Sequence, residues 1–263
     1  MSTRQKNSGD ISFDGISQSF YNKIYKSGKG RIRLEVLKHD MLQGIPELST
    51  RIPLRILDAG GGIGQIARWL ASMGHQVILA DVSQEMLAKA QELNAAEKLD
   101  NRIRILKTAI QDLPSVLKDA KFDLILLHGV IAWMEKPLSA IELLMPMLDD
   151  HGKISLLFYN RDKLIMKWGI CGSISKALNG RSEKQSGLTP INPVGYAEVA
   201  QVCRHLGLKI LSKAGIRIFY KFLKNFPDHN EITEDFVQLE KKYCRIEPFA
   251  SLGEHIHLVL QKI

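Results

Sequence analysis

Residues 54–65 constrain the fold most, because they read LRILDAGGGIGQ, an apolar strand that ends in an acid and turns through glycines into a helix. Glycine adopts positive φ freely and lets a ligand approach without meeting a Cβ, which explains the spacing of Gly60, Gly62 and Gly64. A flexible surface linker is the alternative, but linkers rarely lie between an apolar strand and a helical pattern. The run therefore predicts a turn whose backbone N–H groups lie beside a nucleotide-like ligand.

Apolar runs alternate with helical patterns through the middle of the chain, which is typical of a parallel sheet covered by helices. We expect strands at residues 54–59, 76–80, 103–107, 122–127, 153–158, 209–219 and 255–261. We expect helices at residues 64–73, 84–96, 137–148, 193–206 and 233–243. Upstream, residues 13–25 and 31–42 predict two helices separated by Gly28 and Gly30, which would form a lid before the sheet. Residues 160–192 break the pattern and are interpreted as an insertion with weak helical signals around Met166 and Ile174.

Composition excludes several classes of protein. A chain of 263 residues that is 45% hydrophobic can bury a full core. The polar first ten residues and the lack of about 18 consecutive apolar residues argue against secretion and membrane spanning, so we expect a cytoplasmic protein. The three cysteines, Cys171, Cys203 and Cys244, fit neither a disulfide framework nor a metal site. We therefore expect buried, inert thiols and no metal.

The formal net charge of +8 is concentrated in one segment. Residues 161–224 hold 12 Lys and Arg against 3 Asp and Glu, so the rest of the chain is close to neutral. A surface that only aids solubility is the alternative, but such a surface usually mixes the two signs. A concentrated basic surface attracts phosphates and releases counterions, which favours nucleic acid as the partner.

The glycine loop fits two superfamilies. Residues 58–64 match D-x-G-x-G-x-G, the loop of class I S-adenosylmethionine-dependent methyltransferases. Residues 62–67 also satisfy G-x-G-x-x-A, a dinucleotide pattern of dehydrogenases, and both families place a carboxylate at the end of the next strand, here Asp81. The segment around Asp112 and the two terminal strands favour the methyltransferase, because the strands can pair as its antiparallel hairpin.

We accordingly predict an α/β, Rossmann-like class I methyltransferase fold with a mostly parallel seven-stranded sheet, a terminal antiparallel hairpin, an N-terminal helical lid and an insertion after strand five. Residues 1–50 would form the lid, and residues 51–263 would form the methyltransferase domain with its basic insertion at about 160–192.

Three side chains follow predicted strands at the edge where such sheets bind ligands. Asp81 is positioned to accept hydrogen bonds from the two hydroxyls of an adenosine ribose, and the alternative is an acid at the start of the helix after Ser83. Asp112 is a candidate for the adenine amino group. His128 is a candidate for the pocket wall or a structural histidine. Trp133 is a candidate for core packing or a wall of the cofactor site rather than a platform on which RNA bases stack.

Five short motifs carry a closer resemblance. They are DAGGG at 58–62, GHQVIL at 74–79, FYN at 158–160, GIRIF at 215–219 and YCRIEP at 243–248. Together they resemble the bacterial tRNA 5-carboxymethoxyuridine methyltransferases over residues 13–257, and the insertion at 163–189 matches poorly. The resemblance implies S-adenosylmethionine as cofactor, bound by Arg33, Gly60, Gly61, Asp81, Ile110, Gln111 and His128. To these the glycine-loop pattern adds Asp58 and Gly62, and the position after the third strand adds Asp112. Ile110 stands where members of the family carry alanine, which preserves a backbone contact.

The resemblance implies methyl transfer to the carboxylate of 5-carboxymethoxyuridine at the wobble position, with the tRNA anticodon stem-loop as partner. A carboxylate is already ionised at neutral pH, so it needs alignment and no general base, which agrees with a sequence that shows no catalytic triad or paired carboxylates. Arg217 and Arg245 are candidates to orient that carboxylate or nearby phosphates, and Tyr159 and Asn160 to stack on or bond to the base. A small-molecule O-methyltransferase and a noncatalytic RNA-binding module with a cofactor-shaped pocket are the alternatives.

Overall fold

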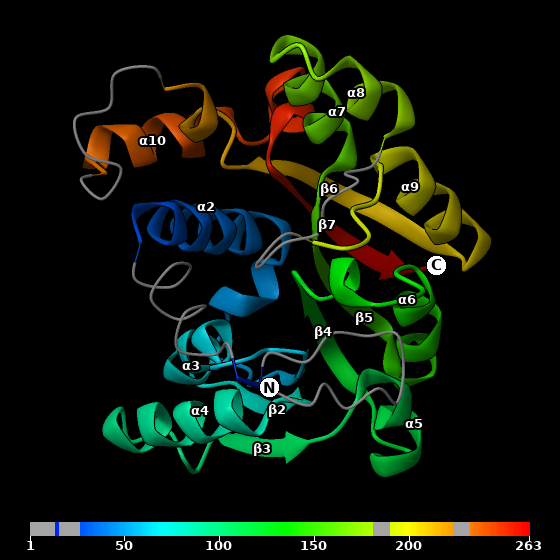
Figure 1. The fold of residues 1–263 in the computed structure, drawn as a ribbon. Coiled ribbons are helices and arrows are strands. Elements are labelled where there is room, and N and C mark those ends of the chain that lie inside the picture. The colour runs from blue at the N-terminus through cyan, green and yellow to red at the C-terminus, as the bar shows by residue number, and fades with distance from the viewer. Residues whose placement is uncertain (1–13, 16–26, 181–189, 224–231) are drawn as a thin grey trace.

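The computed structural model describes residues 14–15, 27–180, 190–223 and 232–263 (Figure 1). Its sheet has seven strands in the order β3-β2-β1-β4-β5-β7-β6. The strands are β1 (Arg55–Ala59), β2 (Gln76–Asp81), β3 (Ile103–Lys107), β4 (Phe122–His128), β5 (Leu148–Tyr159), β6 (Leu208–Ile216) and β7 (His255–Lys262). The first five strands run parallel, and β7 lies antiparallel between β5 and β6. This topology confirms the predicted sheet with its terminal antiparallel hairpin.

Helices cover both faces of the sheet. They are α2 (Gly28–Gly44), α3 (Gln65–Ser72), α4 (Gln84–Ala96), α5 (Leu113–Val116), α6 (Ser139–Leu144), α7 (Arg161–Ile170), α8 (Ile174–Asn179), α9 (Tyr196–His205) and α10 (Glu234–Tyr243). Figure 1 shows α2, α3 and α10 on one side of the sheet and α5, α6 and α9 on the other. No helix among the described residues has the length and apolarity needed to cross a membrane.

The two layers follow from the alternation of side chains along each strand. In β1, Ile56 belongs to the core beneath α2 and α3, whereas its neighbour Leu57 belongs to the core beneath α5 and α6. Helix α2 is an integral part of the first core, because Ile32, Val36 and Met41 are fully buried there. The segment predicted as a lid therefore also carries part of the core.

The expected element boundaries hold where capping and periodicity agree. Helix α4 spans the predicted residues 84–96, and the Ser83 hydroxyl caps it by accepting the backbone N–H of Met86 at 3.2 Å. The separation of two N-terminal helices at Gly28 and Gly30 is wrong, since both glycines lie in the first turn of α2 behind the cap Ser27. Residues 13 and 16–25 of the first expected helix lie outside the described residues.

The predicted insertion begins with two packed helices, α7 and α8. Residues 181–189 of the insertion lie outside the described residues. One expectation for the cysteines is wrong: Cys203 and Cys244 are buried, but Cys171, which follows the last residue of α7, is exposed.

Candidate active site

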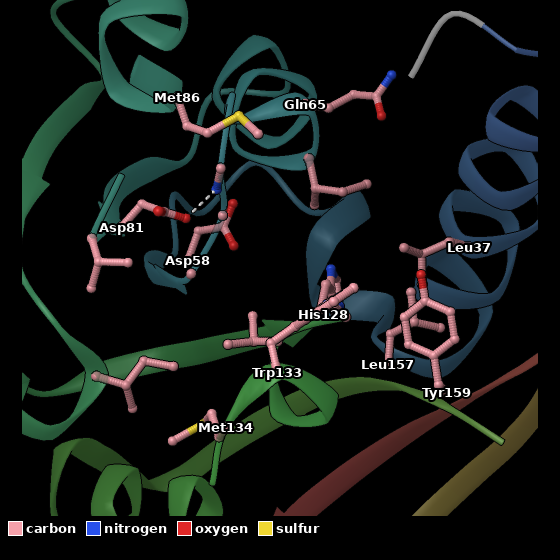
Figure 2. A pocket seen from close by; sticks show the side chains of 18 of the residues that line it. Leu37, Asp58, Gln65, Asp81, Met86, His128, Trp133, Met134, Leu157 and Tyr159 are labelled. Carbon is pink, nitrogen blue, oxygen red and sulfur yellow. Dashed lines mark hydrogen bonds between the residues drawn. The ribbon is translucent and has the colours of Figure 1, made fainter. Parts of the chain in front are cut away.

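A pocket opens at the carboxyl ends of the central strands (Figure 2). Asp58 of β1, Asp81 of β2, His128 of β4 and Tyr159 of β5 all line it, so the strand order brings together four residues from distant parts of the chain. Helix α2 closes the pocket with Arg33 and apolar neighbours. This edge of an open α/β sheet is where such folds bind ligands.

The glycine loop forms one wall through its lack of side chains. Gly60, Gly62 and Gly64 have φ of +77°, +58° and +71°, the left-handed region that favours glycine. A Cβ at Gly60 would lie 2.6 Å from the Val130 side chain. The prediction that the loop N–H groups face a ligand needs correction, because those of Gly60 and Gly61 donate to the Ala80 carbonyl at 2.8 and 3.2 Å.

Asp81 ties the loop to the next helix. Its Oδ2 accepts the Gly62 N–H at 2.8 Å, and its Oδ1 accepts the Ser83 N–H at 2.9 Å. Burial raises the pKa of Asp81, although the hydrogen bonds from these N–H groups oppose the rise. A carboxylate has about four acceptor sites, so roughly two remain for the hydroxyls of a bound diol. The carboxylate thus fits both predicted roles, helix-start acid and ribose acceptor.

Asp58 lies beside Asp81 on the pocket floor, as Figure 2 shows. It is only 2% exposed, and burial together with the charge of Asp81 raises the pKa of Asp58 to about 7. When two carboxylates share a poorly solvated site, ionisation of both is unfavourable because their negative charges repel. A cationic ligand would relieve this repulsion.

The raised pKa of Asp58 predicts a specific pH dependence. Between about pH 4 and pH 7 the folded protein holds a proton on Asp58 that the unfolded chain has released. The free energy of unfolding therefore falls as pH rises through this range, and the full destabilisation is reached above pH 7. We expect Asp58→Asn to stabilise the cofactor-free protein at pH 8, by at most about 4 kcal/mol, and much less at pH 5. Urea unfolding at both pH values tests this. Equal stability differences at pH 5 and pH 8 would contradict a protonated Asp58.

The remaining predicted cofactor residues are placed as follows. Arg33, Gly60, Gly61, Gly62, Ile110, Gln111 and His128 line the pocket. Asp112 does not, because it lies in the exposed part of the short helix Ile110–Asp112, so its adenine contact stays a prediction. Trp133 and Met134 form a wall near His128, in agreement with one of the two roles considered for Trp133 (Figure 2).

Sequence reasoning missed several apolar lining residues, among them Met86 and Leu37. Met86 lies in the first turn of α4, directly after the strand end and cap that mark the site, so its position could have been inferred. Leu37 carried no such signal, because it belongs to the ordinary helical periodicity of α2.

The four candidates for substrate binding separate into two groups. Tyr159 lines the pocket, and Arg217 is near enough for its positive charge to oppose the rise that burial causes in the pKa of Tyr159. Asn160 instead caps α7 and donates to the carbonyls of Ser251 and Gly253, both at 2.9 Å. Arg245 does not line the pocket, and its guanidinium binds the side chain and carbonyl of Asp40.

Buried polar groups without partners surround Tyr159. The ring of His255 lies 4.3 Å from that of Tyr159, measured between centroids, and neither of its nitrogens has a hydrogen-bond partner among the described residues. Arg217 Nε is likewise buried and unpartnered there, while Nη2 pairs with Glu254 at 3.1 Å. Burial lowers the pKa of His255, and the charges of Arg217, Arg33 and Lys163 lower it further. Cationic side chains therefore gather at this end of the pocket.

Comparisons with known proteins agree with this geometry. Residues 57–156 match the model of a methyltransferase domain. The chain is 35% identical over 254 residues to the tRNA 5-carboxymethoxyuridine methyltransferase of Escherichia coli K12, covering 96% of this chain and 97% of that protein. It is also 30% identical to the malonyl-[acyl-carrier protein] O-methyltransferase of Enterobacter lignolyticus, over 51% of this chain and 53% of that protein.

Among solved structures, the magnesium protoporphyrin IX methyltransferase of Synechocystis PCC 6803 with bound SAH matches with a TM-score of 0.64. The match covers 95% of this chain and 96% of that chain at 16% identity. At this identity the likeness shows the fold alone.

Proposed function

Because the chain belongs to the tRNA 5-carboxymethoxyuridine methyltransferase family, we propose that it methylates the carboxylate of 5-carboxymethoxyuridine in tRNA with S-adenosylmethionine as donor. The observation that carries the proposal is the similarity to the Escherichia coli enzyme over nearly the full length of both chains. We further propose that the enzyme acts in the cytoplasm on the wobble nucleotide of the anticodon stem-loop, and that residues 1–50 serve as its helical lid.

The pocket has the features needed to hold the cofactor. Asp81 would accept the ribose hydroxyls, the side-chain-free surface of Gly60 and Gly61 would admit the cofactor, and Ile110 with Gln111 would contact the adenine. The paired acids Asp58 and Asp81 favour a ligand that carries positive charge. S-adenosylmethionine supplies an electrophilic methyl group on a cationic sulfur.

The reaction needs little acid–base chemistry from the protein. A carboxylate oxygen of the substrate forms the new bond to the methyl carbon as the carbon–sulfur bond breaks, and the electron pair of that bond stays on sulfur. The negative charge of the carboxylate and the positive charge of the donor cancel, so no proton moves. What the protein must supply is alignment and exclusion of water, for which a pocket closed by α2 is suited.

We propose that the acceptor carboxylate binds at the Tyr159 end of the pocket. Arg33 and Arg217 bring positive charge to this end, as their influence on the pKa of Tyr159 and of His255 indicates. Lys163 adds to it, because its charge acts on the pKa of His255; Lys163 is 3% exposed, and burial lowers its own pKa to about 8. Asn160 would act indirectly by fixing the chain after Tyr159.

The basic segment would contact the tRNA backbone. Lys167 of α7 is exposed and Lys176 of α8 is half-buried, and both lie on the helical pair beyond the pocket. Lys163 does not contribute to this surface, since its Nζ donates to the carbonyl of Leu252 in the interior. Arg181 and Lys184, which belong to the same basic segment, lie outside the described residues.

Methyl transfer to three tRNAs tests the proposal. We expect the purified protein and labelled S-adenosylmethionine to give a methyl ester, labile to mild alkali, on tRNA that carries 5-carboxymethoxyuridine. Matched tRNAs with uridine or 5-methoxyuridine at the same position should stay unlabelled, because neither offers a carboxylate. Label on either of these, or an alkali-stable product, would contradict the carboxylate mechanism. Turnover of small carboxylates at a rate that tRNA does not change would favour the small-molecule enzyme, and no transfer to any acceptor would favour the noncatalytic module.

A further inference from the structure

A chain of buried hydrogen bonds runs from His128, in the pocket wall, to Asp40 of α2. His128 Nε2 bonds to the Ser155 hydroxyl at 2.8 Å, and that hydroxyl bonds to His257 Nε2 at 2.7 Å. His257 Nδ1 bonds to Asp40 Oδ2, and Arg245 donates to Asp40 from the far side. Asp40, Ser155 and His257 are all 0% exposed. Asp40, Ser155 and His257 come from α2, β5 and β7, respectively, and we refer to these three residues as the relay.

The donor and acceptor of each hydrogen bond in the relay can be assigned by starting from Asp40. Burial alone would raise the pKa of Asp40, but the hydrogen bond from His257 and the charge of Arg245 outweigh it, so the pKa is lowered and Asp40 is a carboxylate. A carboxylate only accepts hydrogen bonds, so His257 Nδ1 must carry a proton.

Two charged groups face His257, Asp40 directly and Arg245 through Asp40. Arg245 already balances the charge of Asp40. The other two residues next to His257 are Ser155 and His128, and neither brings a negative charge. A second cation here would leave an uncompensated charge in the interior, which is costly. His257 Nε2 is then an acceptor, Ser155 donates to it, and the Ser155 oxygen must accept from His128 Nε2–H.

The relay thus determines which nitrogen of His128 carries the proton. Burial lowers the pKa of His128 well below its usual range, so the ring has one proton. That proton lies on Nε2. The other nitrogen, Nδ1, is buried and has no partner among the described residues. His128 therefore has a free lone pair while its ring forms part of the pocket wall.

We propose that Asp40, His257 and Ser155 are positioning residues that hold His128 in its Nε2–H form, so that the electron-rich ring attracts a cationic group of the cofactor. S-adenosylmethionine carries two such groups, the α-ammonium and the sulfonium. The proposal rests on the cofactor-binding part of the proposed function and is independent of the acceptor.

Ser155→Ala tests the proposal, because it removes one hydroxyl from the middle of this chain of hydrogen bonds and leaves the apolar core intact. The matched control is Ser212→Ala on β6, which β7 separates from β5: its hydroxyl is also buried but has no partner among the described residues. Nitrogen-15 NMR of the histidine rings reports the tautomer directly. We expect the Nε2–H form of His128 in the wild type and in Ser212→Ala, and a loss of that single form in Ser155→Ala.

Binding to three ligands identifies the cationic group. Loss of the hydrogen bond between Ser155 and His128 should weaken S-adenosylmethionine binding by about two- to tenfold in Ser155→Ala. S-adenosylhomocysteine keeps the ammonium but lacks the sulfonium charge, so an equal loss indicates the ammonium and a smaller loss the sulfonium. 5′-Methylthioadenosine lacks both charges and should bind the variant as it binds the wild type.

Two results would overturn the proposal. One is an Nδ1–H tautomer of His128 in the wild type. The other is an equal loss of affinity for all three ligands, which would indicate a general change in the shape of the pocket. Neither measurement uses tRNA, so failure of the proposed methyl transfer to tRNA would leave both results interpretable.

Discussion

Gly61→Ala is expected to weaken S-adenosylmethionine binding by at least about a hundredfold, or roughly 2.7 kcal/mol. A Cβ at this position would lie 2.4 Å from Asp58 Oδ2 and 2.4 Å from Leu79 Cδ1. Neither neighbour can move away cheaply, because Leu79 is fully buried in the core and Asp58 is confined to the pocket floor. The loop must therefore shift, and with it the wall that would receive the cofactor. Calorimetric titration of the variant with S-adenosylmethionine measures the loss.

Gly169→Ala is the matched control. Gly169 lies in α7, where an added Cβ meets no atom of the described residues within 4 Å. Alanine is the better helix former by about 0.5–1 kcal/mol, so this variant should bind the cofactor as the wild type does and unfold at slightly higher denaturant. A dissociation constant for Gly61→Ala within threefold of the wild type would show that the loop adapts, and the assignment of Gly61 to the cofactor site would then be wrong.

The parts of the fold that could be predicted are those encoded locally. Helix α4 was predicted to the residue because Ser83 supplies a cap and the following residues keep a helical period. Strand β5 was predicted too short: it begins at Leu148, in a polar stretch that reads as a turn. Its first residue, Leu148, pairs with Phe122, and a register shift separates this pair from the next one, Leu124 with Lys153; an irregularity of this kind depends on the partner strand.

The same distinction applies to the site. Asp58, Asp81 and His128 each end a recognisable strand, so the topology of a parallel sheet was enough to bring them together. The relay could not be predicted in this way, because Asp40 and His257 are 217 positions apart in the chain. One local signal was present: His255 and His257 alternate within an apolar strand and must therefore share a face.

The backbone at Arg217 has an unusual conformation, and the turn that follows it is held by a buried carboxylate. It has φ of +61°, which is uncommon outside glycine, and it directly follows β6. The buried carboxylate of Glu240 holds the next turn by accepting the N–H groups of Ile218, Phe219 and Tyr220 at 2.7, 2.9 and 3.2 Å. This arrangement fixes the guanidinium close enough to Tyr159 and His255 for its charge to act on the pKa of both. Strained backbone of this kind clusters at functional sites.

We expect Arg217→Met to lower single-turnover methyl transfer to tRNA with 5-carboxymethoxyuridine by about 10- to 100-fold. Methionine keeps an apolar stem but removes the charged fork, and a hydrogen bond to a charged group contributes about 1.5–3 kcal/mol. The dissociation constant for S-adenosylmethionine should change by less than about twofold, since Arg217 is not among the residues that line the cofactor pocket.

The design must separate lost function from lost stability, because Arg217→Met leaves Glu254 without its ionic partner. The double variant Arg217→Met/Glu254→Gln removes that unpaired charge, so it should recover stability in urea unfolding but not turnover. Arg55→Met is the matched control: Arg55 pairs with Asp123 and Asp149 at the opposite end of β1 from the pocket, and its loss should leave transfer unchanged. If the double variant transfers methyl groups at the wild-type rate, Arg217 does not bind the acceptor carboxylate. Recognition would then have to come from Arg33 or Lys163, the other cations near Tyr159 and His255.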